Sequence, residues 1–578
     1  MRRSLFSTLM LLLGVILLSI CYWYAYQGII SYSLWWLGLL FAFAAVLISL
    51  TGKSNNAKTA VVFLFAFAAV LYLPLYLKSP QYLSFQDELI HYQTSSLIVE
   101  TGRINAPHTI TPLGQYYPGF SLLRSVLSMV SGLSLEGAGR ASVLITHSLV
   151  LVFIFLSLYL VSKNILLSGM GSLLYASCPS FAFDSYSSYE SLAVGLFFIL
   201  FYLLILKDHK NNIGIALLLI IVTFSLAVTH HVTSFMFLVL ISLIILAKLF
   251  SQKDKENKYI IISMIASVCI LGWLIYNSEG AMYYLSGIFS ARIKSFLEMI
   301  LQFEQPRQFF RASSLPAYEV FLDNYLYPPA ILLTAGAGIY SFLKKREGSY
   351  FYYVLIIWSA IYFLTWPLVP SAGAEMAYRS WATLFIGAAF WAGVGIARLY
   401  NEGKPIIKMA SIIALLVIFV GGTSIGSDDE RRFPVTTRAS GEGAITLDVK
   451  YASDWFGDNF GVYNKVIGDK TVQFLFGFYG RQYVTTESAW RIFYPKEADK
   501  KVLDEVIKYD AVVIDERITQ LLSRGYSYFH AYRTVAGYPL YGYELPLPEE
   551  CVDKFKDIKT LGQIYSNGNI NILGNIHG

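Results

Sequence analysis

An apolar run followed by a cluster of charges decides how this chain is interpreted. VVFLFAFAAVLYLPLYL (residues 61–77) precedes SFQDELIHYQTSSLIVETGR (residues 84–103). The apolar run is long enough to cross a bilayer as a helix. The second stretch contains the adjacent acids Asp87 and Glu88, although only 14% of the residues are charged and 56% are hydrophobic. Two neighbouring carboxylates at the end of a membrane span therefore need an explanation.

Apolar runs of span length recur along most of the 578-residue chain, whose mean hydropathy is +0.53. The pattern predicts a polytopic membrane protein with about thirteen transmembrane helices. The predicted spans lie near residues 4–26, 30–51, 59–78, 139–162, 164–178, 189–207, 212–229, 232–250, 259–276, 328–343, 350–369, 381–399 and 408–425.

Basic residues in the short loops predict the orientation of these spans. Lys53 and Lys58, Lys207 with Lys210, and the segment SQKDKENK fall on one side if the N-terminus is cytoplasmic. Short cytoplasmic loops carry an excess of Lys and Arg. With an odd number of spans, the C-terminus is expected outside the cytoplasm, in a multi-pass protein of the cell membrane.

Composition divides the chain into two predicted domains, a membrane domain over residues 1–426 and a soluble extracytoplasmic α/β domain over residues 427–578. In the second, VYNKVIGDK, TVQFLFGFYG, KYDAVVIDER and IYSNGNINIL have the pattern of strands, and EADKKVLDEVIKY that of a helix. Gly468-Asp469 and Asn567-Gly568 are interpreted as ordinary turns.

Two classes of function are disfavoured by composition. Four cysteines without a CxxC pair argue against a disulfide framework or a thiolate metal site. The formal net charge of +6 is modest and is accounted for by the short loops, so it does not imply a nucleic-acid partner.

The stretch that begins at Asp87 has the apolar spacing of a helix. An amphipathic helix lying in the membrane interface would place several polar residues on one face. These residues are Asp87, His91 and Thr94 or Ser95. PHTITPLGQYYPGFSLLRSVLSMV then indicates an extended segment and a second interfacial helix, so such helices are expected near residues 85–130. The plain alternative is a solvated loop whose acids end a helix.

These residues carry a resemblance. DELIHYQTSSLIVETGRI, followed by YYPGFSLL, resembles the first outer loop of GT-C superfamily glycosyltransferases that use polyprenyl-phosphate sugars, such as protein O-mannosyltransferases and aminoarabinose transferases. The likeness in layout covers about residues 59–425, and its motifs lie within 86–123. The first two spans depart from the simplest family members. The WWDYG-type motif of oligosaccharyltransferases is absent, which argues against transfer of a whole glycan to asparagine.

The resemblance implies an all-α, GT-C-like membrane domain and a hexosyl- or pentosyltransferase. Such an enzyme would move a sugar, with inversion, from an undecaprenyl- or dolichyl-phosphate carrier to an extracytoplasmic glycan, lipid or protein. A carboxylate near the acceptor hydroxyl can accept its proton. By resemblance Asp87 takes this role, with Glu88 as a supporting or alternative acid, and the loop residues His91, Tyr116 and Tyr117 are expected to contact the acceptor or the interface.

A second acid is expected from PSFAFDSYSSYESLAVGLFFIL, in which Asp184 and Glu190 both qualify by resemblance. Outer carboxylates could also hold Mg²⁺ or Mn²⁺. Resemblance to the family members that use a lipid-monophosphate sugar implies a metal-independent enzyme. No cofactor and no metal site are therefore expected. A chance acid in a Tyr- and Ser-rich loop is the open alternative.

The donor phosphate needs cations or hydrogen-bond donors. Arg379, at the predicted outer start of a span, can make paired hydrogen bonds to phosphate oxygens, or can simply anchor the helix end. His230 and His231, at another predicted outer span end, and Arg292, in a long outer loop, are further candidates. Adjacent histidines point to different sides of a helix, so at most one is expected to reach the phosphate.

Two other functions stay open from the sequence. One is a glycan polymerase or ligase with a diphosphate-linked donor, and the other is a secondary transporter or flippase. Transporters usually carry ionisable or broken-helix positions at mid-membrane. Here the ionisable residues collect at the predicted outer surface, which favours the enzyme.

Overall fold

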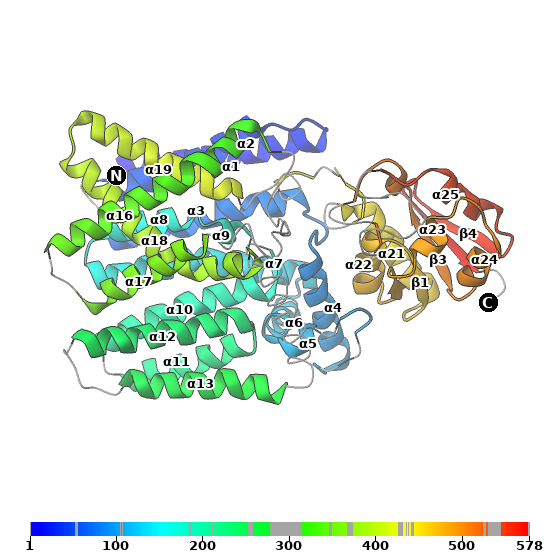
Figure 1. Ribbon diagram of the computed structural model, residues 1–578, viewed down its shortest axis with the longest axis horizontal. Coiled ribbons are helices and arrows are strands. Elements are labelled where there is room, and N and C mark those ends of the chain that lie inside the picture. Colours follow the sequence, from blue (N-terminus) through cyan, green and yellow to red (C-terminus); the bar gives the residue numbers. More distant parts are fainter. Residues whose placement is uncertain are drawn as a thin grey trace, which may run out of the picture. The chain divides into compact units, whose positions relative to one another are not determined.

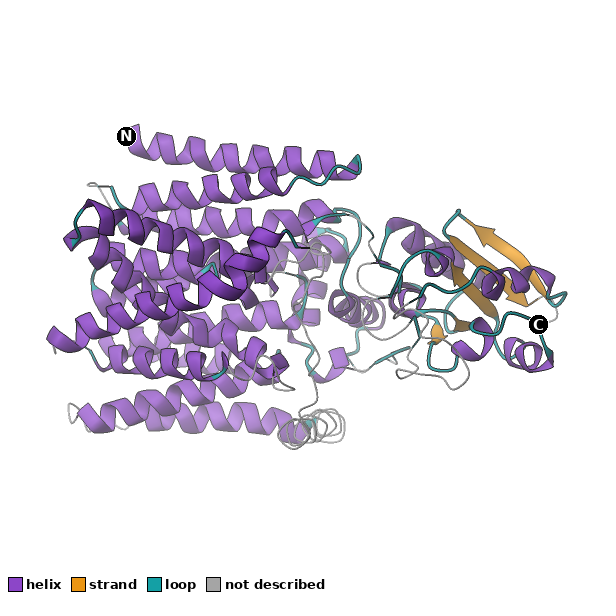
Figure 2. Cartoon of the chain, turned by 45° about the horizontal axis from the view of Figure 1, so that its top comes forward, coloured by secondary structure: helices purple, strands orange, loops and turns teal. Residues whose placement is uncertain are grey.

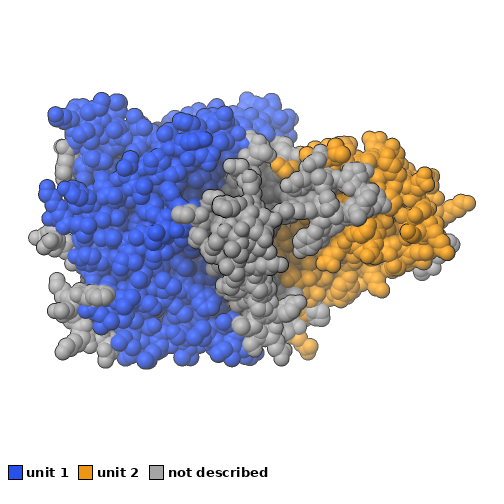
Figure 3. Space-filling view, in the orientation of Figure 1, with its two compact units in different colours: residues 1–77, 140–432 blue, residues 78–139, 433–578 orange. Residues whose placement is uncertain are grey.

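The structure of the chain is a computed structural model. The structure describes residues 2–575 except for 53–55, 105, 107, 112, 184–185, 211, 252–257, 278–314, 346–348, 367–373, 426–431, 435, 437, 441–443, 524–527 and 530–544. The chain divides into two compact units (Figure 3). The membrane unit comprises residues 1–77 and 140–432, and the loop unit comprises residues 78–139 and 433–578.

The membrane unit is helical (Figure 1). Its elements are α1 (Arg2–Tyr26), α2 (Tyr32–Leu50), α3 (Ala57–Lys78), α7 (Leu135–Ser162), α8 (Ile165–Tyr175), α9 (Pro179–Phe183), α10 (Tyr189–His209), α11 (Ile213–Ala227), α12 (His231–Ser251), α13 (Lys258–Tyr276), α15 (Ala317–Phe321), the π-helix η2 (Leu322–Leu326), α16 (Tyr327–Lys345), α17 (Tyr350–Leu364), α18 (Ala374–Glu402) and α19 (Pro405–Ile425).

The predicted spans coincide one by one with helices of this unit. Among the described residues, 10 helices are long and apolar enough to cross a membrane. The other predicted spans correspond to the shorter apolar helices α8, α11 and α17. A bilayer offers backbone N–H and C=O groups no hydrogen-bond partners, so an apolar run this long satisfies them internally as a helix. The prediction of a polytopic helical domain is confirmed.

Helix α18 is the most buried of the long helices, with 89% of its apolar window inside the structure. Small residues allow its neighbours to approach closely. A Cβ added at Gly387 would lie 2.7 Å from the backbone oxygen of Leu355 in α17. Close packing through small residues is a common way to associate helices in membranes, where lipid provides no hydrophobic driving force. Helices α17 and α18 therefore approach each other closely at Gly387.

A buried ion pair ties the N-terminal helix pair to the end of the membrane unit. The guanidinium of Arg432 lies 2.7 Å from the carboxylate of Glu319 and 4.4 Å from the ring centroid of Trp35. Trp36 donates a hydrogen bond to the same carboxylate, at 2.7 Å. Helix α2 thus packs against a charged cluster that local sequence does not reveal.

The loop unit joins the predicted outer loop to the C-terminal residues, and Figure 2 shows its sheet in orange. Its helical elements are α4 (Gln86–Thr101), α5 (Leu113–Tyr116), α6 (Gly119–Ser131), α21 (Leu447–Phe460), α22 (Lys470–Phe474), the π-helix η5 (Leu475–Tyr479), α23 (Trp490–Phe493), α24 (Lys500–Val506), the 3₁₀-helices η6 (Glu516–Thr519) and η7 (Lys554–Asp557), and α25 (Glu550–Asp553). The predicted division at residue 426 concerns composition and stays a prediction. In the structure, residues 78–139 form one compact unit with residues 433–578.

Five strands form one mixed sheet in the order β2-β1-β3-β5-β4. They are β1 (Lys465–Ile467), β2 (Tyr483–Thr485), β3 (Ala511–Asp515), β4 (Leu561–Ser566) and β5 (Ile570–Asn575). Strand β1 pairs in parallel with β2 and β3, whereas β5 runs antiparallel to β3 and β4. The sheet confirms the predicted α/β character of the C-terminal region.

One predicted strand is wrong and one turn is confirmed. TVQFLFGFYG forms α22 and η5, because the Asp469 side chain caps α22 by accepting a hydrogen bond from the Val472 N–H at 3.0 Å. Nearly every residue of this run is buried, so its apolar pattern could not distinguish a strand from a buried helix. The turn at Asn567-Gly568 joins β4 to β5, and Gly568 adopts φ 96°.

Candidate active site

Three helices of the membrane unit bring together an acid, a histidine and an arginine that were predicted separately. A terminal nitrogen of Arg379 lies 3.0 Å from Oε1 of Glu190. Nε2 of His230 lies 3.5 Å from the same oxygen. Glu190 begins α10, His230 directly precedes α12, and Arg379 lies near the start of α18. One carboxylate oxygen is therefore shared by two nitrogen-bearing side chains.

The three side chains of this cluster differ in their exposure to solvent. The side chains of Glu190 and His230 are 5% and 3% exposed, whereas that of Arg379 is 25% exposed. A buried carboxylate is costly unless it is paired, and the Arg379 guanidinium supplies the pairing charge. The position of Glu190 in the first turn of α10 is also favourable, because the N-terminal end of a helix carries positive partial charge. Arg379 is the most exposed member of the cluster.

A hydrogen bond to Thr233 orients the ring of His230. Its Nδ1 lies 2.8 Å from the hydroxyl of Thr233. In a neutral ring that carries its proton on Nε2, Nδ1 accepts a hydrogen bond from the Thr233 hydroxyl. The ring also lies 4.8 Å from Tyr189 and 5.0 Å from His231. His231 thus neighbours the cluster, while His230 is the one in contact with Glu190.

Two further candidates, Asp184 and Arg292, lie outside the described residues. Within the described part of the chain, no group of three or more His, Cys, Asp or Glu side chains is placed to hold a metal ion. The absence of a cofactor stays a prediction.

In the loop unit, the two adjacent acids of α4 have different surroundings. The Glu88 carboxylate is buried and accepts hydrogen bonds from the backbone N–H groups of Ser84 and Phe85, at 3.0 and 3.3 Å. This is a capping interaction, which satisfies N–H groups at the helix start. Asp87 is half-buried. Glu88 therefore has a clear structural task, and Asp87 is the more accessible carboxylate of the pair.

The predicted polar face of α4 exists and packs against α6. His91, Thr94 and Ser95 are all buried. Nδ1 of His91 lies 3.1 Å from the Ser121 hydroxyl, and the Ser95 hydroxyl donates to the Ser121 carbonyl at 3.2 Å. The polar face of α4 is therefore buried against α6 within the loop unit. Helix α4 ends at Gly102, which adopts φ 66°.

Sequence reasoning missed Arg124, which is fully buried in α6. Its Nε donates to the carbonyl of Leu135 at 2.7 Å, and a terminal nitrogen donates to the carbonyl of Glu88 at 3.3 Å. Burial lowers the pKa of Arg124 from its ordinary value. A lone arginine in the apolar run SLLRSVL was the only available signal, and it does not reveal which helix ends the side chain holds.

The predicted outer loop packs on the C-terminal residues within the loop unit. The Gln93 amide donates to the carbonyl of Gly477 at 3.2 Å, and the hydroxyl of Thr109 donates to that carbonyl at 2.6 Å. The rings of Tyr92 and Tyr479 lie 4.5 Å apart. Burial lowers the pKa of His108 in this loop to about 4. The described residues Tyr92, Gln93 and Thr109 of the loop are therefore packed against η5.

The two loop tyrosines are placed differently. Tyr117 is buried, and Tyr116 ends the short helix α5 half-buried. The expected contact of both residues with the acceptor or the interface stays a prediction.

Solved structures share this architecture. The apo oligosaccharyltransferase of Archaeoglobus fulgidus matches 80% of this chain and 70% of its own, with a TM-score of 0.50 and 10% identity. This chain has a GT-C-like fold. ArnT from Cupriavidus metallidurans matches over 90% of this chain and 98% of its own, with TM-score 0.47 and 10% identity bound to undecaprenyl phosphate, and 0.40 and 12% in the apo state. No protein-family model and no curated protein matches the sequence.

Proposed function

We propose that this chain is an integral membrane glycosyltransferase that transfers one sugar from a polyprenyl-phosphate carrier to an acceptor outside the cytoplasm. The observation that carries the proposal is the Glu190–His230–Arg379 cluster in a GT-C-like fold. It presents a partly exposed guanidinium from buried support at the starts of membrane helices. The ionisable groups of this cluster lie at helix ends rather than at mid-membrane, which favours an enzyme over a transporter.

Arg379 is the proposed ligand of the donor phosphate. A guanidinium can make two parallel hydrogen bonds to phosphate oxygens. The negative charge of Glu190 offsets part of the positive charge of Arg379 and orients its side chain. His230 in turn helps to position Glu190. A phosphate that approaches the exposed part of Arg379 would therefore meet a preorganised donor, which lowers the entropic cost of binding.

Asp87 is the proposed general base. The acceptor hydroxyl oxygen forms a bond to the anomeric carbon as the bond between that carbon and the phosphate oxygen breaks. The carboxylate takes the hydroxyl proton, and the bonding electrons leave with the lipid phosphate. Attack opposite to the leaving group inverts the anomeric centre. Asp87 is favoured over Glu88 because the latter is committed to the cap of α4.

Undecaprenyl phosphate, the part shared by bacterial donors of this kind, is the probe that tests the proposal. The full chain in nanodiscs should bind it, and Arg379→Ala should weaken this binding. Mass spectrometry of co-purifying lipid should then identify the attached sugar for a transfer assay with that donor. Absence of binding, or transfer from a diphosphate-linked donor only, would reject the monophosphate proposal and favour the polymerase or ligase alternative.

The proposed topology has its own test. We propose that residues 79–138 and 427–578 lie outside the cytoplasm, with a cytoplasmic N-terminus. Single cysteines at Arg103 and Asn459, both exposed, should react with a membrane-impermeant reagent in intact cells when the native cysteines are replaced. Reaction only after the membrane is permeabilised would invert the orientation.

A further inference from the structure

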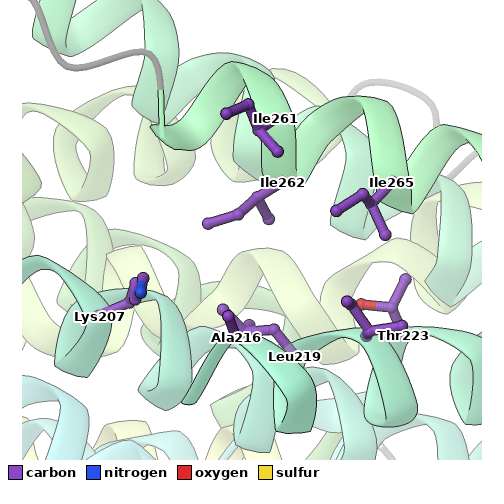
Figure 4. Close-up of a pocket in the computed structure, with 8 residues that line it drawn as sticks. Lys207, Ala216, Leu219, Thr223, Ile261, Ile262 and Ile265 are labelled. Atoms are coloured by element: carbon purple, nitrogen blue, oxygen red, sulfur yellow. The ribbon is translucent and has the colours of Figure 1, made fainter. Parts of the chain in front are cut away.

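A groove in the membrane unit lies between α11 and α13, and the proposed reaction does not use it. Its volume is about 210 Å³. Figure 4 shows isoleucines of α13 facing residues of α11 across it, with Lys207 of α10 at one end. The lining residues are Lys207, Ala216, Leu219, Ile220, Thr223, Ile261, Ile262 and Ile265.

The helices that form the groove belong to the lipid-exposed edge of the membrane unit. Only 17% of the apolar window of α13 is buried, compared with 89% for α18. Large apolar side chains of both helices are exposed, such as Ile221 in α11 and Val268 in α13. In a bilayer these exposed side chains would face hydrocarbon. From Ala216 to Thr223 the groove follows about 10 Å of helix axis, enough for part of a lipid chain.

The end of the groove is basic. Lys207 is 9% exposed, and its ammonium donates to the carbonyl of Asn212 at 3.2 Å. The adjacent acid, Asp208, forms an ion pair with Lys248 at 2.8 Å. Lys210, two residues after Asp208, is exposed. Among the described residues, Lys207, Lys248 and Asp208 in α10 and α12, with Lys210 just after α10, give three lysines and one aspartate, an excess of positive charge beside an apolar groove.

We infer that this groove binds an anionic phospholipid, with one hydrocarbon chain between α11 and α13 and the phosphate at Lys207. The occupant follows from the chemistry of the lining: an apolar channel that ends at a buried ammonium fits a chain that ends at an anion. The predicted orientation places this end at the cytoplasmic leaflet, where anionic lipids attract basic residues. The inference does not rest on the proposed glycosyltransferase reaction.

Native mass spectrometry of the full chain, titrated with phosphatidylglycerol or with phosphatidylcholine of the same chains, tests this site. The wild type should prefer phosphatidylglycerol by about fivefold, because one lysine contributes roughly 1 kcal/mol towards an anionic lipid. Lys207→Met, which keeps an unbranched side chain, should abolish the preference. Lys210→Met removes the same charge from an exposed neighbour and should leave most of it intact. Equal losses in both variants, or no preference in the wild type, would overturn the inference.

A second variant separates the groove from general surface charge. Ala216→Phe leaves Lys207 in place and fills the groove, so it should weaken binding of both phospholipids. Unchanged phosphatidylglycerol binding in Ala216→Phe would show that the lipid binds elsewhere. Undecaprenyl phosphate added as competitor should leave phosphatidylglycerol bound. Its displacement of that lipid in the wild type, but not in Lys207→Met, would assign the groove to the carrier lipid and overturn the proposed occupant.

Discussion

The guanidinium of Arg379 lies 3.0 Å from the carboxylate of Glu190, which also lies 3.5 Å from the imidazole of His230. These groups lie at the starts of α10 and α18 and just before α12, and the arginine is the most exposed of the three. The arrangement supports the proposal that Arg379 binds the donor phosphate and that Glu190 positions the Arg379 side chain. This proposal can be tested residue by residue.

Replacing Arg379 by Ala should weaken use of a lipid-phosphate donor by about 2 kcal/mol or more, because a charge-assisted hydrogen bond is lost. Lys should restore only part of the loss, since an ammonium cannot reproduce the planar fork of a guanidinium. The measurement is kcat/KM for the donor. Arg398→Ala, at the other end of α18, is the matched control and should behave as the wild type. Wild-type kinetics for Arg379→Ala would reduce this residue to a helix anchor.

Glu190→Gln should raise KM for the donor more than it lowers kcat, because glutamine keeps the shape but no longer holds Arg379 by charge. His230→Gln should show a weaker form of the same effect, since it acts on Arg379 through Glu190. Steady-state kinetics with a varied donor concentration distinguishes the roles. If kcat falls while KM is unchanged, Glu190 is a catalytic acid rather than a positioning residue.

Substitution of the two acids of α4 should have different effects, on the rate of transfer for one and on stability for the other. Asp87→Asn should lower the rate of transfer by about a hundredfold to ten-thousandfold, as is typical when a general base is removed. Donor binding and thermal unfolding should stay near those of the wild type.

Glu88→Gln should instead lower stability by about 1 kcal/mol, because the cap of α4 is weakened. Its effect on the rate of transfer should be smaller than that of Asp87→Asn. Transfer assays and thermal unfolding of both variants provide the comparison. Loss of transfer in Glu88→Gln alone would move the base to Glu88, and full activity in both would leave these acids without a catalytic role.

Asp469 should make the stability of the chain depend on pH. Burial, together with the nearby charge of Asp515, raises the pKa of Asp469 to about 7. The folded state then binds a proton that the unfolded state has released, so stability falls as pH rises from about 4 to about 7. The slope within this window is about 1.4 kcal/mol per pH unit.

Asp469→Asn can still accept the hydrogen bond that caps α22 and should remove this contribution. Thermal unfolding of the full chain at pH 5 and pH 8 should therefore show a smaller loss at high pH for the variant than for the wild type. Asp499 caps α24 in the same way from an exposed position, so Asp499→Asn is the control and should keep the wild-type difference. Identical pH dependence in all three proteins would contradict the raised pKa.

Local sequence determined the elements whose stability depends on near neighbours and on solvent. An apolar run such as residues 61–77 forms a helix because lipid cannot satisfy its backbone. The end of α4 at Gly102 and the turn at Gly568 follow from glycine's tolerance of positive φ. The prediction of a strand at residues 471–480 was wrong, because burial on all sides removes the hydrophobic periodicity on which such predictions depend.

Tertiary structure alone decided which charges meet. Nothing near Glu190 in the sequence indicates that its partner is Arg379, and nothing near Gln93 indicates the carbonyl of Gly477. Such contacts depend on distance through space, and the energy of a buried charge depends on whatever the fold places beside it. The types of residue at the candidate site were therefore predictable, but their pairing, and the structural use of Glu88 and Arg124, required the folded chain.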